Sequence, residues 1–102
     1  MSKKRGKEEF PHFRYYIKSK HPALITNESI DKKQYEFHGV TSYPYDGKHR
    51  NIKVIPNPDT TKKSAMYIKR RKKYDDKKMF KNKYEWKVPK FLKDLFSQKK
   101  DL

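Results

Sequence analysis

Four polar residues of this chain have side chains suited to proton transfer on an anionic substrate. His21 stands before Pro22, where an aliphatic run begins, and Thr41 stands near the end of the next apolar run. His49 and Arg50 follow in the loop after Thr41. A histidine exchanges its proton near neutral pH and can act as a general acid or base. A threonine hydroxyl can donate a hydrogen bond and an arginine can hold an anion, so these residue types suit acid–base chemistry.

The charge of the chain predicts a polyanionic partner. Its 102 residues include 28 Lys and Arg against 12 Asp and Glu, which gives a net charge of +16. Residues 61–102 hold 16 of these cations and only 5 of the acids. RNA, DNA, acidic lipids and acidic proteins are all attracted by such a field. Because only the last twenty residues offer a weak apolar face to a membrane, we expect nucleic acid and no membrane binding. The alternative is that the lysines only keep the protein in solution.

One cationic segment in the second half interleaves charges with aromatic rings. Lys69–Lys73 lies between Tyr67 and Tyr74. Cations can follow a phosphate backbone while bases stack on aromatic rings, a combination typical of proteins that bind single strands. The residues predicted to bind nucleic acid are Lys48, Tyr67, Lys69, Arg70, Arg71, Lys72, Lys73 and Tyr74. A solvated segment between strands is the alternative interpretation.

Several functional classes are excluded by what the sequence lacks. There is no cysteine, so disulfides and thiolate metal sites are excluded. The four histidines have no metal-binding spacing, and we expect neither a metal ion nor a cofactor. The basic start, MSKKRGKEEF, is not followed by an apolar stretch. We therefore expect no signal peptide, no transmembrane span and a cytoplasmic protein.

Short strands are the elements expected to position these residues. Phe13, Tyr15 and Ile17 alternate with more polar residues, which is the period of a half-buried strand. Related patterns predict strands over 13–18, 23–26, 35–41, 52–55 and 64–68, with loops over 27–33 and 42–51.

A C-terminal helix is predicted after these strands. Its apolar stripe, at helical spacing after a proline that suits a first turn, consists of Val88, Phe91, Leu92, Leu95 and Phe96. The expected fold is mainly β, a small, partly open barrel flanked by the C-terminal α-helix. We expect a disordered basic tail over 1–12, a single domain over 13–96 and a second tail over 97–102.

The stretch HPALITNESIDKKQYEFHGVTS, residues 21–42, resembles the PemK/MazF family of ribonuclease toxins from type II toxin–antitoxin systems. In that family an Arg-Pro pair leads into an aliphatic strand, and a second strand ends in Thr-Ser or Thr-Gly. Here His21-Pro22 takes the first place and Gly39–Ser42 the second. The resemblance covers about residues 18–42 and extends loosely to residue 58. It implies an SH3-like barrel, metal-independent cleavage of single-stranded RNA, a homodimer mate and an acidic antitoxin as a partner. It also implies that His21 and Thr41 occupy the positions of the catalytic pair.

The chain departs from the family at His21, where arginine is usual. An imidazole is neither permanently charged nor a two-pronged phosphate donor. Metal-free cleavage of RNA needs a base for the 2′-hydroxyl, an acid for the departing 5′-oxygen and donors for the phosphate charge. His21 can be the acid or the base, Thr41 a donor, and His49 or Arg50 the second proton carrier or the charge clamp. The alternative is that a histidine before a proline is only a surface turn residue.

Three classes of function fit these observations. The first is a toxin-type endoribonuclease. The second is a non-catalytic nucleic-acid-binding module, for which charge and aromatic rings suffice. The third is a small interaction protein from a mobile element, which binds an acidic partner. Catalysis requires His21 and Thr41 to converge near His49 or Arg50, whereas binding alone does not.

Overall fold

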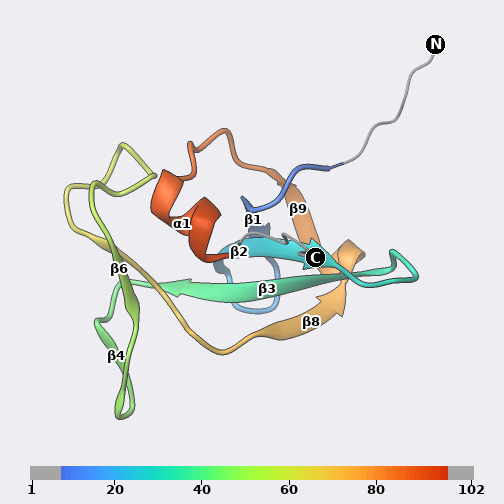
Figure 1. Cartoon of the computed structure of the whole chain (residues 1–102), viewed down its shortest axis with the longest axis horizontal. Helices are drawn as coiled ribbons and strands as arrows, with labels where there is room; N and C mark the ends of the chain where they lie inside the picture. Colours follow the sequence, from blue (N-terminus) through green and yellow to red (C-terminus); the bar gives the residue numbers. More distant parts are fainter. Residues whose placement is uncertain (1–7, 97–102) are drawn as a thin grey trace.

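Residues 8–96 are described by the computed structural model, and strands make up most of their regular structure (Figure 1). The strands are β1 His12–Tyr16, β2 His21–Glu28, β3 Gln34–Thr41, β4 Tyr45–Asp46, β5 His49–Arg50, β6 Ile52–Val54, β7 Met66–Ile68, β8 Lys73–Asp76 and β9 Phe80–Lys83. A 3₁₀ turn, η1, spans Lys77–Met79, and one helix, α1, spans Lys90–Leu95. The prediction of a mainly β protein with a C-terminal helix is confirmed.

The main sheet begins as a meander and ends by returning to its first strand. β1, β2 and β3 are successive antiparallel neighbours, with Phe13 opposite Leu24. The far edge of β3 pairs with β8 along Gln34–Phe37 and with β7 at its C-terminal end, and β6 pairs with β7. After η1 the chain reaches the opposite side of the sheet, where β9 pairs with β1 (Figure 1). Within residues 8–96 the sheet is not closed, since β6 and β9 form its two edges.

Both faces of this sheet are packed, because successive strand residues point to opposite faces. On one face, Leu24 and Leu92 are fully buried in a cluster formed by Phe13, Leu24, Val40, Ile52, Val54, Met66, Ile68, Val88 and Leu92. On the other face lie Ala23, Ile25, Tyr35, Phe37 and Phe80, with Tyr16 packed against them. The ring of Tyr16 lies 4.6 Å from that of Phe37 and 4.7 Å from that of Phe80, centroid to centroid. Aromatic area therefore compensates for the small number of aliphatic residues.

The observed strands agree with the predicted strands better in the first half of the chain than in the second half. The predicted loop over 27–33 is shorter, because β2 continues to Glu28. The predicted loop over 42–51 contains the β4–β5 hairpin. The pattern analysis also missed β8 and β9, whose sequences KYDD and FKNK carry few apolar residues.

The helix is shorter than its predicted stripe. Of the five stripe residues, Val88 and Leu92 are buried and Phe96 packs against the same cluster. Phe91 and Leu95 are 44% and 55% exposed, so the prediction that they pack in the same stripe is wrong. A six-residue helix has fewer than two turns and presents only one residue, Leu92, fully to the sheet. Within the described part of the chain, no helix is long and apolar enough to cross a membrane.

The ordered domain begins earlier than the predicted boundary at residue 13. The hydroxyl of Tyr35 donates to the Glu8 carboxylate at 2.7 Å, and Arg14 approaches the same group at 3.2 Å. The ring of Phe10 stacks on His12 at 5.3 Å. Residues 8–12 therefore pack on the domain, and of the two predicted tails only 1–7 and 97–102 lie outside the described residues.

The contacts and the burial of His12 favour its neutral form. Its Nδ1 lies 2.7 Å from the carbonyl oxygen of Glu9, and Arg14 Nε donates to its Nε2 at 3.0 Å. A proton on Nε2 would face the Arg14 N–H and break this bond. Burial lowers the pKa of His12, and burial likewise lowers the pKa of His38.

Acidification below about pH 6.5 is therefore expected to destabilise the fold. When a histidine pKa is lower in the folded state, the unfolded chain binds more protons between the two pKa values, so stability rises with pH across that window. The stabilisation is fully present above the ordinary histidine pKa and is lost as the pH falls through it. Urea unfolding at pH 7.5 and pH 5.5 measures the effect, and His12→Asn should show a smaller loss than the wild type. An identical loss in the variant would mean that His12 does not contribute.

Candidate active site

A cavity of about 460 Å³ opens beside the start of β2 and the end of β3. His21 and Thr41, which the sequence predicted as a pair, both line it. The other polar and aromatic residues in its lining are Tyr15, Lys20, Ser42, Asn57, Asp59, Lys62, Tyr84 and Trp86. The structure therefore gathers two candidate residues that stand twenty positions apart in the sequence.

The antiparallel pairing of β2 and β3 explains why His21 and Thr41 meet. Ala23 lies opposite Gly39 in the ladder. If this register is continued by two residues, Thr41 comes opposite His21. The start of one antiparallel strand necessarily lies beside the end of its neighbour, so the histidine and the threonine are positioned by the sheet rather than by loops.

The turn before β2 fixes the backbone of His21 and leaves its ring open. Lys20 has a φ of 62°, in the left-handed region, and its N–H donates to the carbonyl oxygen of Tyr16 at 2.9 Å. The N–H of His21 donates to Ser19 Oγ at 3.1 Å. Among residues 8–96, none hydrogen-bonds to the imidazole of His21, which is exposed. The ring is therefore accessible to a bound substrate.

Thr41 keeps its hydroxyl hydrogen available. Its Oγ1 accepts a hydrogen bond from the N–H of Tyr43 at 3.2 Å. A hydroxyl that accepts in this way can still donate its own hydrogen to a second group. Thr41 can therefore donate to an anion in the cavity.

Two stacked rings form an aromatic side of the cavity. Tyr84 and Trp86 have centroids 4.1 Å apart and planes at 5°, and Trp86 also lies 5.4 Å from the ring of Phe13. Burial, with nearby Tyr15 and Asp59, raises the pKa of Tyr84, so its phenol remains protonated. Trp86 also lines a second cavity of about 580 Å³, together with Asn57, which both cavities share. Trp86 is therefore at once a core residue and a cavity residue.

The loop between β6 and β7 supplies the remaining charged groups. Asn57 Nδ2 donates to the carbonyl oxygen of Ser64 at 2.9 Å, which ties the two ends of the loop together. Thr61 donates through its hydroxyl to Asp59 Oδ1 at 2.6 Å, and this bond holds the pKa of Asp59 below its usual value. Lys62 lines the cavity together with Lys20, which belongs to the turn before β2. Two cations therefore accompany one carboxylate that is already hydrogen-bonded.

The other two predicted catalytic residues are elsewhere. His49 and Arg50 form β5 of the exposed hairpin, and neither lines the cavity. Lys48 lies beside them in the hairpin. The structure therefore separates the predicted four into a pair in the cavity and a pair on the hairpin.

The residues of the predicted cationic segment have different neighbours. Arg70 Nε donates to the carbonyl oxygen of Arg50 at 2.8 Å, which joins it to the hairpin. Lys72 Nζ lies 3.7 Å from the Glu36 carboxylate, to which the hydroxyl of Tyr74 also donates at 3.0 Å. The N–H of Lys69 donates to the Gly39 carbonyl oxygen, and Arg71 is exposed. Tyr67 of β7 and Lys73 of β8 lie opposite the β3 residues Thr41 and Phe37.

Sequence reasoning missed most of the cavity lining. The alternation of Tyr84 and Trp86 is a period-two signal that could have marked an extended aromatic segment. Lys20, Asn57 and Lys62 carried no such signal, because their positions depend on turns and on a loop.

Residues 8–96 contain no group of three or more His, Asp or Glu side chains that could hold a metal ion. Comparisons with protein-family models, with curated proteins and with solved structures gave no match to this chain.

Proposed function

We propose that this protein binds single-stranded RNA in the cavity at His21 and Thr41 and cleaves it there as a metal-independent endoribonuclease. The observation that carries the proposal is that a histidine and a threonine from two neighbouring strands line the same cavity as Lys20 and Lys62. This set combines a group that exchanges protons, a hydroxyl donor and two cations. These residues supply the base and the charge stabilisation that phosphodiester cleavage requires, and water can supply the acid.

In the proposed reaction the 2′-oxygen of one nucleotide attacks the adjacent phosphorus, and the bond from phosphorus to the 5′-oxygen breaks. His21 takes the proton from the 2′-hydroxyl as a general base. Thr41 and the two lysines offset the charge that develops on the phosphate. The departing 5′-oxygen takes a proton from water, and His21 returns its proton to the hydroxide that this leaves, so the products are a 2′,3′-cyclic phosphate and a 5′-hydroxyl. The family that this stretch resembles usually has a permanently charged arginine at this position, whereas His21 can carry a proton.

The stacked pair Tyr84 and Trp86 supports the choice of a single strand as the substrate. Unpaired bases stack on aromatic side chains, and each such contact is worth about 1–3 kcal/mol. A base in a duplex does not expose its face in this way. DNA can bind through the same contacts but lacks the 2′-hydroxyl nucleophile.

We also propose that the sheet is an SH3-like, partly open barrel. Support comes from the return of β9 to β1 after the η1 turn, which bends the meander back toward its first strand. Aromatic residues from β1, β3 and β9 meet on the face inside this bend, with Tyr35 and Phe80 at 5.4 Å. β3 and β9 are not neighbours in this sheet, so a flat sheet would not bring these two rings together.

A non-catalytic RNA-binding module is the second candidate. The stacked rings and the two lysines favour it, since binding through them needs no proton transfer. The difference lies in whether bound RNA is cut.

The test is to incubate the purified protein, with EDTA, with single-stranded RNA and with DNA of the same sequence. We expect RNA fragments that end in a 2′,3′-cyclic phosphate and begin with a 5′-hydroxyl, and intact DNA. RNA that is bound but left whole would support the binding module instead. RNA that is neither bound nor cut would contradict both candidates.

A further inference from the structure

The β4–β5 hairpin presents a surface that belongs neither to the hydrophobic core nor to the cavity. It forms its own two-stranded sheet, with Gly47 at a φ of +64° in its turn. Tyr43 and Tyr45 are 69% and 53% exposed, and the hairpin contributes no residue to either hydrophobic cluster of the described chain. Figure 1 shows it projecting away from the body of the sheet. Large exposed tyrosines on a projecting element need a reason outside the fold.

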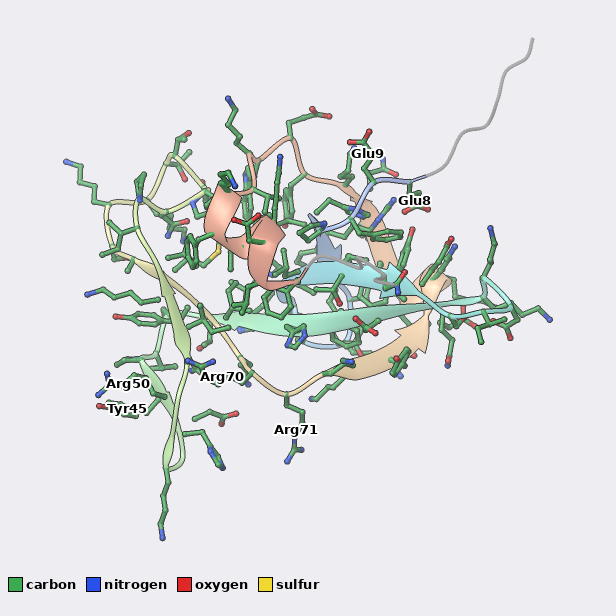
Figure 2. All side chains as sticks on the ribbon, viewed as in Figure 1. Glu8, Glu9, Tyr45, Arg50, Arg70 and Arg71 are labelled. Carbon is green, nitrogen blue, oxygen red and sulfur yellow. The ribbon has the colours of Figure 1, made fainter. Side chains whose placement is uncertain are left out.

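Cations are arranged around one of these tyrosines. The guanidinium of Arg50 lies 5.7 Å from the centre of the Tyr45 ring, and its Nη2 donates to the Tyr45 hydroxyl at 3.4 Å. Arg70, from the segment after β7, donates to the backbone of Arg50 at 2.8 Å. Figure 2 shows Tyr45, Arg50 and Arg70 together at one corner of the molecule. The hairpin also contains Lys48 and a single acid, Asp46.

A further arginine lies on the hairpin side of the molecule. Figure 2 shows Arg71 on the same side of the molecule as the hairpin, whereas Glu8 and Glu9 lie on the opposite side. Arg71 therefore adds to the positive charge on the hairpin side.

The base of the hairpin is fixed to the rim of the cavity. Thr41 and Ser42 line the cavity, and the N–H of Tyr43 donates to Thr41 Oγ1. Asn51, which is only 3% exposed, donates through Nδ2 to the carbonyl oxygen of Tyr43 at 3.0 Å and through its N–H to that of Pro44 at 2.8 Å. These bonds set the direction in which the hairpin leaves the sheet. A chain that leaves the cavity past Ser42 meets the hairpin next.

We propose that the β4–β5 hairpin is a second RNA-binding surface, which holds the single strand beyond the cavity by stacking on Tyr45 and by phosphate contacts from Arg50 and Arg70. This inference rests on the proposed function, and it assigns Arg50 to substrate binding rather than to catalysis. RNA fits better than an acidic protein because an exposed ring beside a guanidinium offers both a stacking face and a phosphate donor.

The test compares the binding of two single-stranded RNAs, one of about four nucleotides that fills only the cavity and one of about twelve. The variants are Tyr45→Ala and Arg50→Ala, and Arg71→Ala is the matched control, since it removes the same charge from an exposed arginine outside the cluster of Tyr45, Arg50 and Arg70. Quenching of the fluorescence of Trp86, the only tryptophan in the chain, reports occupancy of the cavity, and anisotropy of labelled RNA reports total binding.

We expect each hairpin variant to bind the longer RNA about 5- to 100-fold more weakly, the range that one stacking contact supplies, and to bind the shorter RNA within about twofold of the wild type. Arg71→Ala should lower the affinity for the longer RNA less than Arg50→Ala does. Melting temperatures equal to that of the wild type support this interpretation.

Other outcomes would overturn the inference. Unchanged affinity of both variants for the longer RNA would remove the hairpin from the interface while leaving the cavity proposal intact. An equal loss for both lengths would place the effect in the cavity. If the wild type also binds polyglutamate, and the two variants lose as much affinity for polyglutamate as for RNA, the hairpin is a general surface for acidic polymers. A wild type that binds neither RNA would refute the proposed function and this inference together.

Discussion

Replacement of His21 by alanine is expected to slow the cleavage of single-stranded RNA by about 10²- to 10⁴-fold, the usual share of a general acid or base. RNA affinity should stay within a few-fold, because the lysines and the stacked rings remain. The measurement is a single-turnover cleavage rate with EDTA present, together with the affinity for the same RNA. His21 is exposed and makes only backbone contacts with its turn, so the variant should fold.

His49→Ala is the matched control for this prediction. It removes a histidine from the hairpin, outside the cavity, and should leave the cleavage rate of a short RNA unchanged. Thr41→Val, which keeps the shape of the side chain but removes the hydroxyl, should also lower the rate. If His21→Ala and His49→Ala cleave as fast as the wild type, His21 is not the base. If the wild type, His21→Ala and His49→Ala all bind RNA and none of them cleaves it, the protein is a binding module.

Leu92→Asp is expected to lower the free energy of unfolding by about 3–5 kcal/mol, because it places an unpaired charge in a fully buried position. Leu92 packs in the cluster that also holds Phe13 and Leu24, so the effect should reach the whole domain. Urea unfolding followed by circular dichroism measures it. For a domain of this size, a loss of that magnitude is a large part of the total stability.

Leu95→Asp provides the comparison within the same helix. Leu95 is 55% exposed, so its replacement should change the free energy of unfolding by less than about 0.5 kcal/mol. Equal, small effects at the two positions would mean that α1 does not pack on the sheet in solution. Equal, large effects would mean that Leu95 is covered by another molecule, such as a second copy of the chain.

The meeting of His21 and Thr41 could be predicted from the sequence because it depends only on neighbouring strands. The aliphatic run after Pro22 and the alternation over residues 35–41 mark two strands, and adjacent antiparallel strands bring the start of one beside the end of the next. No knowledge of the rest of the chain is needed for this step. The same local logic predicted that a helix would follow Pro89.

The rest of the site could not be predicted in this way because it depends on long-range pairing. Tyr84 and Trp86 reach the cavity only because β9 pairs with β1, and the sequence of β9, FKNK, carries no strand pattern. The hairpin strands have two residues each and are exposed, so they lack the apolar alternation that marks a half-buried strand. His49 and Arg50 therefore looked like cavity residues from their sequence distance to Thr41 alone.

The return of β9 to β1 also has a consequence for the order in which the site comes into being during translation. His21 and Thr41 leave the ribosome well before Tyr84 and Trp86, since synthesis proceeds from the N-terminus. A nascent chain that has emerged only through β7 possesses the histidine and the threonine but lacks the stacked pair Tyr84 and Trp86. The complete cavity arises only when β9 has been made and has paired with the first strand. The stacked pair therefore comes to lie beside the cavity of His21 only after almost the whole domain has been synthesised.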